Sequence, residues 1–341
     1  MLVTLRSFAK INIGLAIGPQ RRDGFHELRT VYQTLALHDM VRVEASSGSG
    51  IEIKCDDPCV PTDESNTCYR MAEAVLRALK IQRRVTIRIK KRLPLEGGLG
   101  GASSNAVATL LGLERVLRRR IPLERKLKLG AQVGSDLPLF LIGGTVLGKG
   151  RGERIAELSD LPPLACVVVT PEIGISTPAA FAAWDQMASG GRATSAGGGR
   201  GRPPHTDLTG GLTVPAAFDK IRVFSRRLDG RLRGTASGVP GARRARDRAE
   251  ALLLDLVRAG IENDFEAVVF PQHPELREVK KLLLREGAGY ASLSGSGSAV
   301  YGLFASRQKA AQAAARLRRQ GTPSQATRTL SRREYWRMMW E

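Results

Sequence analysis

The sequence predicts an α+β protein built from two domains. Its 341 residues exceed the common size of a single domain and are enough to bury a sizeable core. Through roughly the first 150 positions, segments that alternate like half-buried strands mix with segments of helical periodicity. A new unit begins at the continuous apolar stretch 165–171, which is typical of a buried strand. We therefore expect a first domain over residues 1–160 and a second over residues 161–341.

The first predicted domain contains strands and an amphipathic helix. Residues 41–45 (VRVEA) and 51–55 (IEIKC) alternate between apolar and polar positions around the turn-rich SSGSG, which predicts two paired strands. Residues 85–91 (VTIRIKK) alternate in the same way and predict a further strand. Between them, residues 66–79 predict a helix whose apolar face consists of Met71, Ala72, Val75, Leu76 and Leu79.

A glycine-rich loop, PLEGGLGGASSNAV (94–107), joins this last strand to an apolar-periodic run that predicts a helix. Ser103 or Ser104 is expected to cap the start of that helix. A helix start carries unpaired N–H groups, and glycines let a ligand approach them closely, so phosphate is the ligand that such a loop suits. A plain turn is the alternative, because the loop matches neither the Walker A pattern nor G-x-G-x-x-G.

The second predicted domain contains a long segment without apolar periodicity. Residues 189–204 are rich in Gly, Ser and Arg, which predicts a flexible loop or disordered insertion. A second weakly patterned, Arg-rich stretch covers residues 226–248. Beyond it, residues 276–285 predict a helix that ends at Gly287, and residues 290–304 predict a strand, a glycine–serine turn and another strand.

The net charge of +20 is concentrated in two segments. Residues 192–248 and 307–337 together carry 17 of these charges, so the rest of the chain is close to balanced. A strongly basic protein could bind nucleic acid or an anionic surface. No aromatic-rich RNA motif accompanies the charge, so we favour a solvated basic surface and do not expect nucleic acid as a partner.

Composition also bears on metals, membranes and location. The four cysteines form no C-x-x-C pair and the chain has only four histidines, so a zinc site is not expected. No apolar run approaches the roughly 20 residues that a membrane span needs. The first residues lack the apolar core of a secretory signal. We expect a cytoplasmic protein with reduced thiols, no membrane partner, and a monomeric or homodimeric state.

Three further motifs carry chemistry-bearing residues. FAKIN holds Lys10 and Asn12 in the first strand, DGFHEL holds Phe25 and His26 in a turn, and GSDLPLF holds Asp136 ahead of a proline. Each has an ordinary structural interpretation when taken alone: a surface lysine, a turn histidine and a helix cap.

Together with the glycine loop and SLSGSGSAVYGLF, these motifs resemble those of the GHMP small-molecule kinases, in the same order and at similar spacing. The resemblance implies a two-domain fold, with an N-terminal ribosomal-protein-S5-like domain and a C-terminal α/β sandwich domain. It implies ATP and Mg²⁺ as cofactors and transfer of the γ-phosphoryl group to an alcohol. DGFHEL favours a cytidyl diphosphate sugar alcohol, phosphorylated at its 2-hydroxyl, over mevalonate, homoserine or galactose. The sequence departs from the family at Glu96 and Ala102, where glycine is usual, and at Phe25, where tyrosine is usual.

The resemblance also assigns roles to residues. Asp136 matches the catalytic aspartate and Lys10 the catalytic lysine, while Asn66 matches a residue near the adenine. Residues matched to the phosphate loop are Gly97, Gly98, Leu99, Gly100, Gly101, Ala102, Ser103 and Ser104. Residues matched to the substrate site are Asn12, Phe25, His26, Thr177 and Phe181, with Phe181 on the face of the cytosine opposite the DGFHEL turn. The alternatives are a GHMP kinase for another alcohol and a basic nucleic-acid-binding protein.

Overall fold

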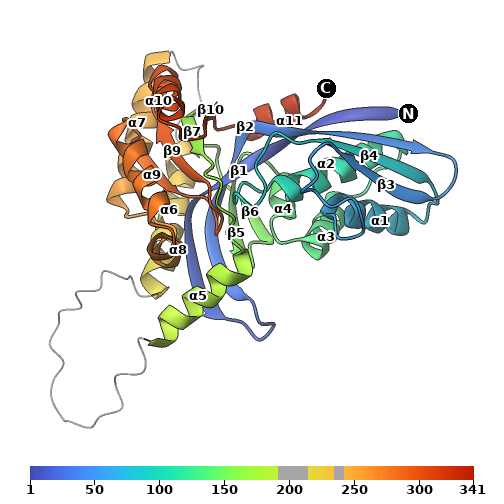
Figure 1. Cartoon of the computed structure of the whole chain (residues 1–341), viewed down its shortest axis with the longest axis horizontal. Coiled ribbons are helices and arrows are strands. Elements are labelled where there is room, and N and C mark those ends of the chain that lie inside the picture. The colour runs from blue at the N-terminus through green and yellow to red at the C-terminus, as the bar shows by residue number, and fades with distance from the viewer. Residues whose placement is uncertain (191–213, 234–241) are drawn as a thin grey trace, which may run out of the picture.

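The structure is a computed structural model, and it describes residues 1–190, 214–233 and 242–341. Two lobes lie side by side, each built on its own sheet (Figure 1). The first lobe contains the N-terminus, and its sheet is covered by short helices. The second lobe contains most of the chain after residue 164.

The first sheet has the strand order β3-β4-β2-β5-β6, and β1 pairs with β2. Its strands are β1 (Leu2–Gln20), β2 (His26–Ser46), β3 (Gly50–Cys55), β4 (Arg84–Lys90), β5 (Thr145–Gly150) and β6 (Arg154–Glu157). The helices of this lobe are α1 (Thr67–Leu79), α2 (Gly101–Val116), α3 (Leu123–Val133) and α4 (Leu137–Phe140). The predicted helix 66–79 and strand 85–91 are thus confirmed within a residue or two.

The predicted pairing of residues 41–45 with residues 51–55 is wrong. Both segments are strands, but β4 lies between them, antiparallel to β2 and parallel to β3. Alternation indicates which face of a strand is buried and not which strand is its neighbour. Strand β4 contributes three buried residues, Val85, Ile87 and Ile89, to the core that contains Val41 and Val43. Strand β3 contributes only one buried residue, Ile53, which suits an edge position.

Strands β1 and β2 form a long hairpin that reaches from the first sheet to the second lobe (Figure 1). Its register shifts between Phe8 and Lys10 and again between Ile13 and Leu15. At its far end, the N–H of Leu15 donates to the carbonyl of Glu262, and Leu15 accepts from the N–H of Asp264, both at 2.9 Å. The hairpin therefore fixes the DGFHEL turn relative to both lobes.

The second sheet has the order β10-β7-β9-β8 with every pair antiparallel. Its strands are β7 (Ala165–Val169), β8 (Tyr290–Leu293), β9 (Val300–Phe304) and β10 (Ser324–Arg328). Helices α5 (Thr177–Gly190), α6 (Val214–Arg233), α7 (Ala242–Arg258), α8 (Glu266–Gln272), α9 (Pro274–Arg285) and α10 (Arg307–Arg319) complete the lobe. The predicted strand 165–171, helix 276–285 and strand–turn–strand 290–304 are confirmed.

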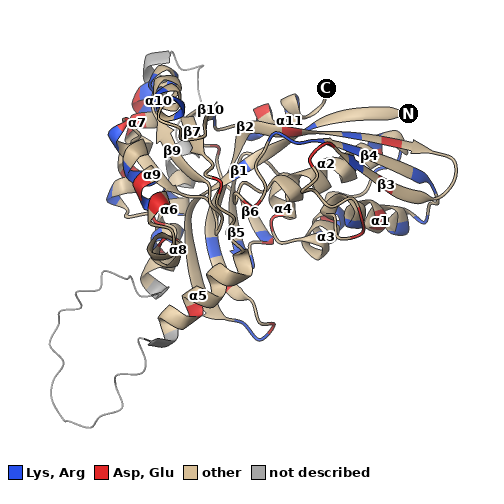
Figure 2. Cartoon of the chain, viewed as in Figure 1, with Lys and Arg blue, Asp and Glu red and all other residues tan. Residues whose placement is uncertain are grey.

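The two Arg-rich segments fall partly outside the described residues. Of the predicted insertion 189–204, residues 189 and 190 end α5, and the remainder lies outside the described residues. The stretch 226–248 includes the end of α6 and the start of α7. Figure 2 shows Lys and Arg on α7 and α9 interspersed with Asp and Glu, and the Arg246–Glu250 and Lys281–Glu278 pairs join such residues. Helix α10 carries Lys and Arg without any Asp or Glu.

The last helix, α11 (Arg332–Met339), returns to the first lobe. The hydroxyl of Tyr335 donates to the carbonyl of Phe140 at 2.6 Å, and Nε1 of Trp336 donates to the carbonyl of Ile142 at 2.9 Å. The predicted domain 161–341 therefore includes a helix that packs on the first lobe. No helix within the described ranges is long and apolar enough to cross a membrane.

The junction between the hairpin and the second lobe contains a buried carboxyl group. Oδ2 of Asp264 accepts a hydrogen bond from the N–H of Ile17 at 2.8 Å. Burial raises the pKa of Asp264 from 3.8 to about 6. Because the folded-state pKa lies above the ordinary value, the folded protein holds this proton more tightly than the unfolded chain, and stability falls as the pH rises from about 4 to about 6.

Asp264→Asn keeps an oxygen that can accept from Ile17 and removes this titration. Between about pH 4 and about pH 7, we expect the free energy of unfolding of the wild type to fall by about 2 kcal/mol relative to that of the variant. Urea titrations of both proteins at the two pH values measure the difference. A pH dependence that is identical in the two proteins would contradict the assignment.

Candidate active site

Two pockets meet at the glycine loop. The loop pocket, about 300 Å³, is lined by the glycine loop, the start of α1 and the end of β4. The hairpin pocket, about 380 Å³, is lined by β1, β2, the turn between them, the start of α5 and the β8–β9 turn. Gly98, Gly100 and Ser103 line both. A ligand in either pocket would therefore touch the same loop.

The glycine loop ends in a helix start that no side chain caps. Gly100, in left-handed conformation at φ 72°, is the N-cap of α2 and makes no side-chain cap hydrogen bond. The predicted cap at Ser103 or Ser104 is wrong because both lie inside the first turn, where Ser104 donates its N–H to the Gly100 carbonyl at 2.9 Å. The preceding N–H groups of the first turn have no carbonyl within the helix to bond. This end of α2 therefore suits an anion.

Close packing against the β8–β9 turn holds the loop in place. Ser294 donates its hydroxyl to the carbonyl of Gly98 at 3.0 Å, and the N–H of Ala299 donates to the carbonyl of Gly97 at 3.1 Å. A Cβ on Gly98 would lie 1.9 Å from the carbonyl oxygen of Ser294. Backbone from the two lobes meets here with no space for a side chain.

The two departures from the family loop differ in their geometry. Ala102 lies in the first turn of α2, and its φ is not positive, so alanine is accommodated there without strain. Glu96 has a φ of 53°, in the left-handed region that favours glycine. Of the two departures, Glu96 is therefore the one that places a non-glycine residue in left-handed backbone.

Lys10 and Asp136 form an ion pair at the base of the hairpin pocket. Nζ of Lys10 lies 3.2 Å from Oδ2 of Asp136 and donates to Oδ1 of Asn12 at 2.7 Å. The lysine is 3% exposed, whereas the Asp136 side chain is 28% exposed. Asn12 also donates to the Thr30 hydroxyl at 2.9 Å. Its amide thus orients the lysine, and a bond from Asn12 to substrate stays a prediction.

Tyr32 completes the environment of Asp136 and was not identified from the sequence. Its hydroxyl donates to Oδ1 of Asp136 at 3.0 Å, so each oxygen of the carboxylate has its own donor. Burial, and then the negative charge of Asp136, raise the pKa of Tyr32 well above its usual 10. The phenol therefore stays protonated and remains a donor. A tyrosine within a strand pattern carries no sequence signal of this role.

Aromatic rings form the other end of the hairpin pocket. The rings of His26 and Phe181 stack with centroids 5.2 Å apart and planes at 8°, and Phe265 packs edge-on against Phe181. Nδ1 of His26 donates to the carbonyl of Gly18 at 2.9 Å, and Nε2 lies 3.0 Å from a carboxylate oxygen of Asp185. The two stacked rings are in direct contact, so a base would enter beside them and not between them.

Two other predicted substrate residues also line the hairpin pocket. Phe25 is 50% exposed at the tip of the turn. Oγ1 of Thr177 lies 2.7 Å from Oγ of Ser296, which links the start of α5 to the β8–β9 turn. Together these contacts bring segments from both lobes into one pocket.

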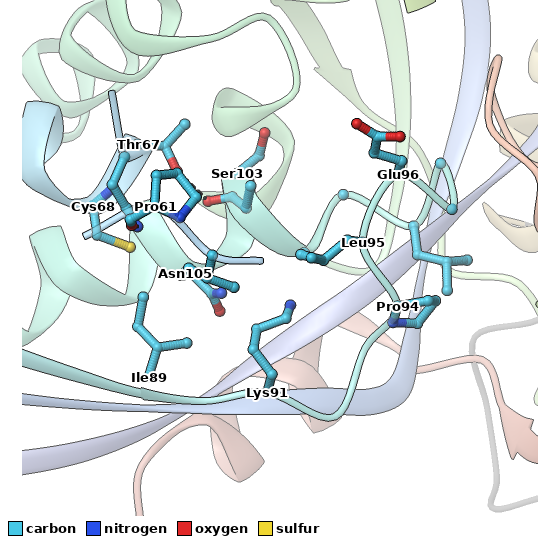
Figure 3. Close-up of a pocket in the computed structure, with 18 of the residues that line it drawn as sticks. Pro61, Thr67, Cys68, Ile89, Lys91, Pro94, Leu95, Glu96, Ser103 and Asn105 are labelled. Carbon is cyan, nitrogen blue, oxygen red and sulfur yellow. Dashed lines mark hydrogen bonds between the residues drawn. The ribbon is translucent and has the colours of Figure 1, made fainter. Parts of the chain in front are cut away.

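The loop pocket has a polar side beneath the glycine loop (Figure 3). Lys91 pairs with the buried Asp39 at 2.5 Å, and Asn105 donates to the same carboxylate at 3.0 Å. Asn66 also lines this pocket, where its Oδ1 caps α1 by accepting from the N–H of Cys68 at 2.8 Å. The structure thus places Asn66 in the pocket with a capping role, and its contact with adenine stays a prediction.

All the predicted site residues lie in or next to these two pockets. The catalytic pair and the predicted substrate residues line the hairpin pocket, while Asn66 and most of the phosphate loop line the loop pocket. Ser104 is buried behind the loop and lines neither pocket. Tyr32, Lys91 and Arg151 also line the pockets, and sequence reasoning did not find them. Ser296, from the predicted glycine–serine turn, lines the hairpin pocket as well.

Comparisons with known proteins give one consistent family. Residues 66–144 match the family described as GHMP kinases N terminal domain, and residues 246–322 match GHMP kinases C terminal. The chain is 37% identical to the 4-diphosphocytidyl-2-C-methyl-D-erythritol kinase of Solibacter usitatus, covering 89% of this chain and 81% of that protein. It is 34% identical to the enzyme of that name from Moorella thermoacetica, covering 96% and 99%.

Solved structures show the same fold. A crystal structure of 4-(cytidine 5'-diphospho)-2C-methyl-D-erythritol kinase superposes with a TM-score of 0.67 at 28% identity, over 96% of this chain and 98% of that one. A mevalonate kinase from L. major superposes with a TM-score of 0.64 at 14% identity, over 96% and 95%. The predicted two-domain α+β fold is therefore confirmed.

Proposed function

We propose a function for this chain from one premise: it belongs to the GHMP kinase family. It transfers the γ-phosphoryl group of ATP to the 2-hydroxyl of 4-diphosphocytidyl-2-C-methyl-D-erythritol, a step of the non-mevalonate route to isoprenoid precursors. The observation that carries this proposal is the glycine loop shared by two pockets, with Lys10 and Asp136 beside it.

The loop pocket would hold ATP. The triphosphate would lie against the uncapped start of α2, where backbone N–H groups and the helix dipole favour negative charge. Because Gly98, Gly100 and Ser103 also face the hairpin pocket, the terminal phosphate can meet the alcohol there. In-line positioning and charge stabilisation are what phosphoryl transfer requires of a protein.

The hairpin pocket would hold the alcohol beside Asp136. The carboxylate accepts or orients the proton of the attacking 2-hydroxyl, and Lys10 stabilises charge on the transferring group. Tyr32 and Lys10 donate to different oxygens of Asp136, which fixes the plane of the carboxylate. The carboxylate therefore meets the hydroxyl in one orientation.

Mg²⁺ would enter with the nucleotide. It prefers oxygen ligands, including phosphates, and it keeps several waters. Within the described ranges no group of three or more His, Cys, Asp or Glu side chains could hold a metal ion. An ion held mainly by phosphate oxygens would fit these residues, and Ser103, which lines both pockets, would supply a hydroxyl oxygen to it. When bound, the ion neutralises charge on the β- and γ-phosphates.

Tyr32→Phe tests whether the phenol positions Asp136. Losing one hydrogen bond to a charged group should lower kcat about tenfold, while both KM values stay within twofold or so. Tyr290→Phe is the matched control, because its hydroxyl bonds the Ile261 carbonyl away from both pockets. If Tyr32→Phe lowered only the melting temperature, as expected of the control, the positioning role would be refuted.

His26 and Phe181 would recognise the cytosine together with Phe25. Base stacking contributes roughly 1–3 kcal/mol, and a buried hydrogen bond about as much. We therefore expect Phe181→Ala and His26→Ala each to raise the KM of the cytidyl substrate about tenfold or more, with little change in the KM of ATP. Steady-state kinetics with each substrate varied in turn measures both values.

Trp184→Ala is the matched control for this prediction. Trp184 is partly buried on the same helix and packs into the same core, but it does not line the hairpin pocket. It should lower the melting temperature and leave the cytidyl KM intact. The same pattern in Phe181→Ala would mean that Phe181 is only a core residue.

An ADP-release assay on a panel of alcohols tests the proposed function. With ATP and Mg²⁺ present, we expect turnover with the cytidyl substrate and none above background with mevalonate or homoserine. Turnover that favours mevalonate or homoserine would assign the chain to a different member of the family.

A further inference from the structure

The turn between β5 and β6 presents one arginine to the hairpin pocket. Arg151 lies between Gly150 at φ 73° and Gly152 at φ 102°, both in the region that favours glycine. A Cβ on Gly152 would lie 2.4 Å from the Tyr32 hydroxyl, so the turn packs directly on the residue that donates to Asp136. Its position relative to the Lys10–Asp136 pair is thereby fixed.

Two carboxylates hold the backbone of this turn. Oε1 of Glu27 accepts from the N–H of Gly150 at 3.1 Å, and Oε2 of Glu153 accepts from the N–H of Arg151 at 2.6 Å. Glu27 also pairs with Arg21 and Arg154. Both hydrogen bonds are made by backbone N–H groups of the turn, so neither occupies the Arg151 side chain, which lines the pocket.

The Arg151 guanidinium group rests on the ring of Phe25, 4.7 Å from its centroid. Among the residues that the structure describes, the Lys, Arg, Asp and Glu side chains that line the hairpin pocket are Lys10, Asp136 and Arg151. Lys10 is paired with Asp136, and nearby Asp23 is paired with Arg21 at 3.1 Å. Within the described ranges, no ion pair involves the Arg151 side chain. Among the described side chains that line the pocket, one positive charge, that of Arg151, is therefore in excess.

We propose that Arg151 binds the diphosphate of the substrate, an inference that rests on the proposed function. In a cytidyl diphosphate alcohol, the diphosphate separates the base from the hydroxyl that reacts. In the pocket, Arg151 stands between the two corresponding ends: its side chain touches Phe25, and its turn touches Tyr32 beside Asp136. The planar fork of arginine matches phosphate oxygens, and here it would meet them next to an aromatic face.

Binding of cytidine and of CDP separates this role from simple support of Phe25. Both probes carry the base, and only CDP carries the diphosphate. In the wild type, CDP should compete with the cytidyl substrate more tightly than cytidine does. In Arg151→Gln, we expect the CDP inhibition constant to rise roughly 10- to 100-fold and the cytidine constant to stay within about twofold. Arg151→Lys, which keeps the charge and loses the fork, should be intermediate.

Arg22→Gln is the matched control. Arg22 is exposed on the β1–β2 turn that carries Phe25, and it does not line the pocket. The variant therefore makes the same change in charge outside the pocket. It should leave both constants unchanged. If Arg151→Gln weakened cytidine and CDP equally, arginine would only support Phe25, and the proposal would be overturned. An unchanged CDP constant would overturn it as well.

The proposed function fails in a different way. If neither cytidine nor CDP competed with substrate in the wild type, the pocket would not recognise a cytidyl group at all, and the substrate assignment itself would be wrong.

Discussion

Asp136→Asn is expected to lower kcat by on the order of 10²- to 10⁴-fold while the protein folds normally. The amide cannot accept the proton of the attacking hydroxyl. It can still satisfy both neighbours, with its oxygen toward Lys10 and its nitrogen toward the Tyr32 hydroxyl, which accepts as well as donates. Melting temperature and ATP affinity should therefore stay close to those of the wild type.

Single-turnover kinetics measures the chemical step of Asp136→Asn without interference from product release. The control is Asp219→Asn, an exposed acidic side chain on α6 that pairs with Arg222 and does not line either pocket. A value of kcat within threefold of the wild type for Asp136→Asn would remove Asp136 from the catalytic step.

Lys10→Met should cause a comparable loss. The lysine is almost fully buried, and its ammonium group contacts both Asp136 and Asn12. Methionine preserves much of the side-chain volume but leaves the carboxylate without its cation and Asn12 without a donor. We expect kcat to fall by on the order of 10²- to 10⁴-fold, with a modest loss of stability from the unpaired polar groups.

The double variant, Lys10→Met with Asp136→Asn, distinguishes cooperation from independence. Groups that act as a unit lose most of their effect when the first is removed, so the combined loss should be smaller than the product of the single losses. A combined loss equal to that product would mean that the two side chains contribute separately, in spite of their 3.2 Å contact.

Much of this site could be predicted from the sequence because its parts are short, contiguous motifs. The composition of the glycine loop predicts a loop, and the apolar periodicity on either side predicts the strand before it and the helix after it. FAKIN, DGFHEL and GSDLPLF come from three separated segments, and the fold brings Lys10, His26 and Asp136 into one pocket. The order of the motifs, and not any single residue, carried that prediction.

Contacts between distant segments could not be read in the same way. The insertion of β4 between β2 and β3 depends on which buried strand packs best beside β2. The alternation of apolar and polar residues does not indicate which strand is the neighbour. Tyr32 and Arg151 acquire roles only because β2 and the β5–β6 turn converge on Asp136 and Phe25. The helix start at Gly100 was missed because serine is the commoner cap, whereas a left-handed glycine leaves the N–H groups open.

The central claim is that recognition of the cytidyl group in the hairpin pocket delivers the 2-hydroxyl to Asp136. The most direct test compares kcat/KM for the full cytidyl substrate with kcat/KM for 2-C-methyl-D-erythritol 4-phosphate, which has the same hydroxyl and lacks the cytidyl group. Stacking and hydrogen bonding to the base predict a preference on the order of 10³-fold for the full substrate. Comparable values for the two alcohols would contradict the account.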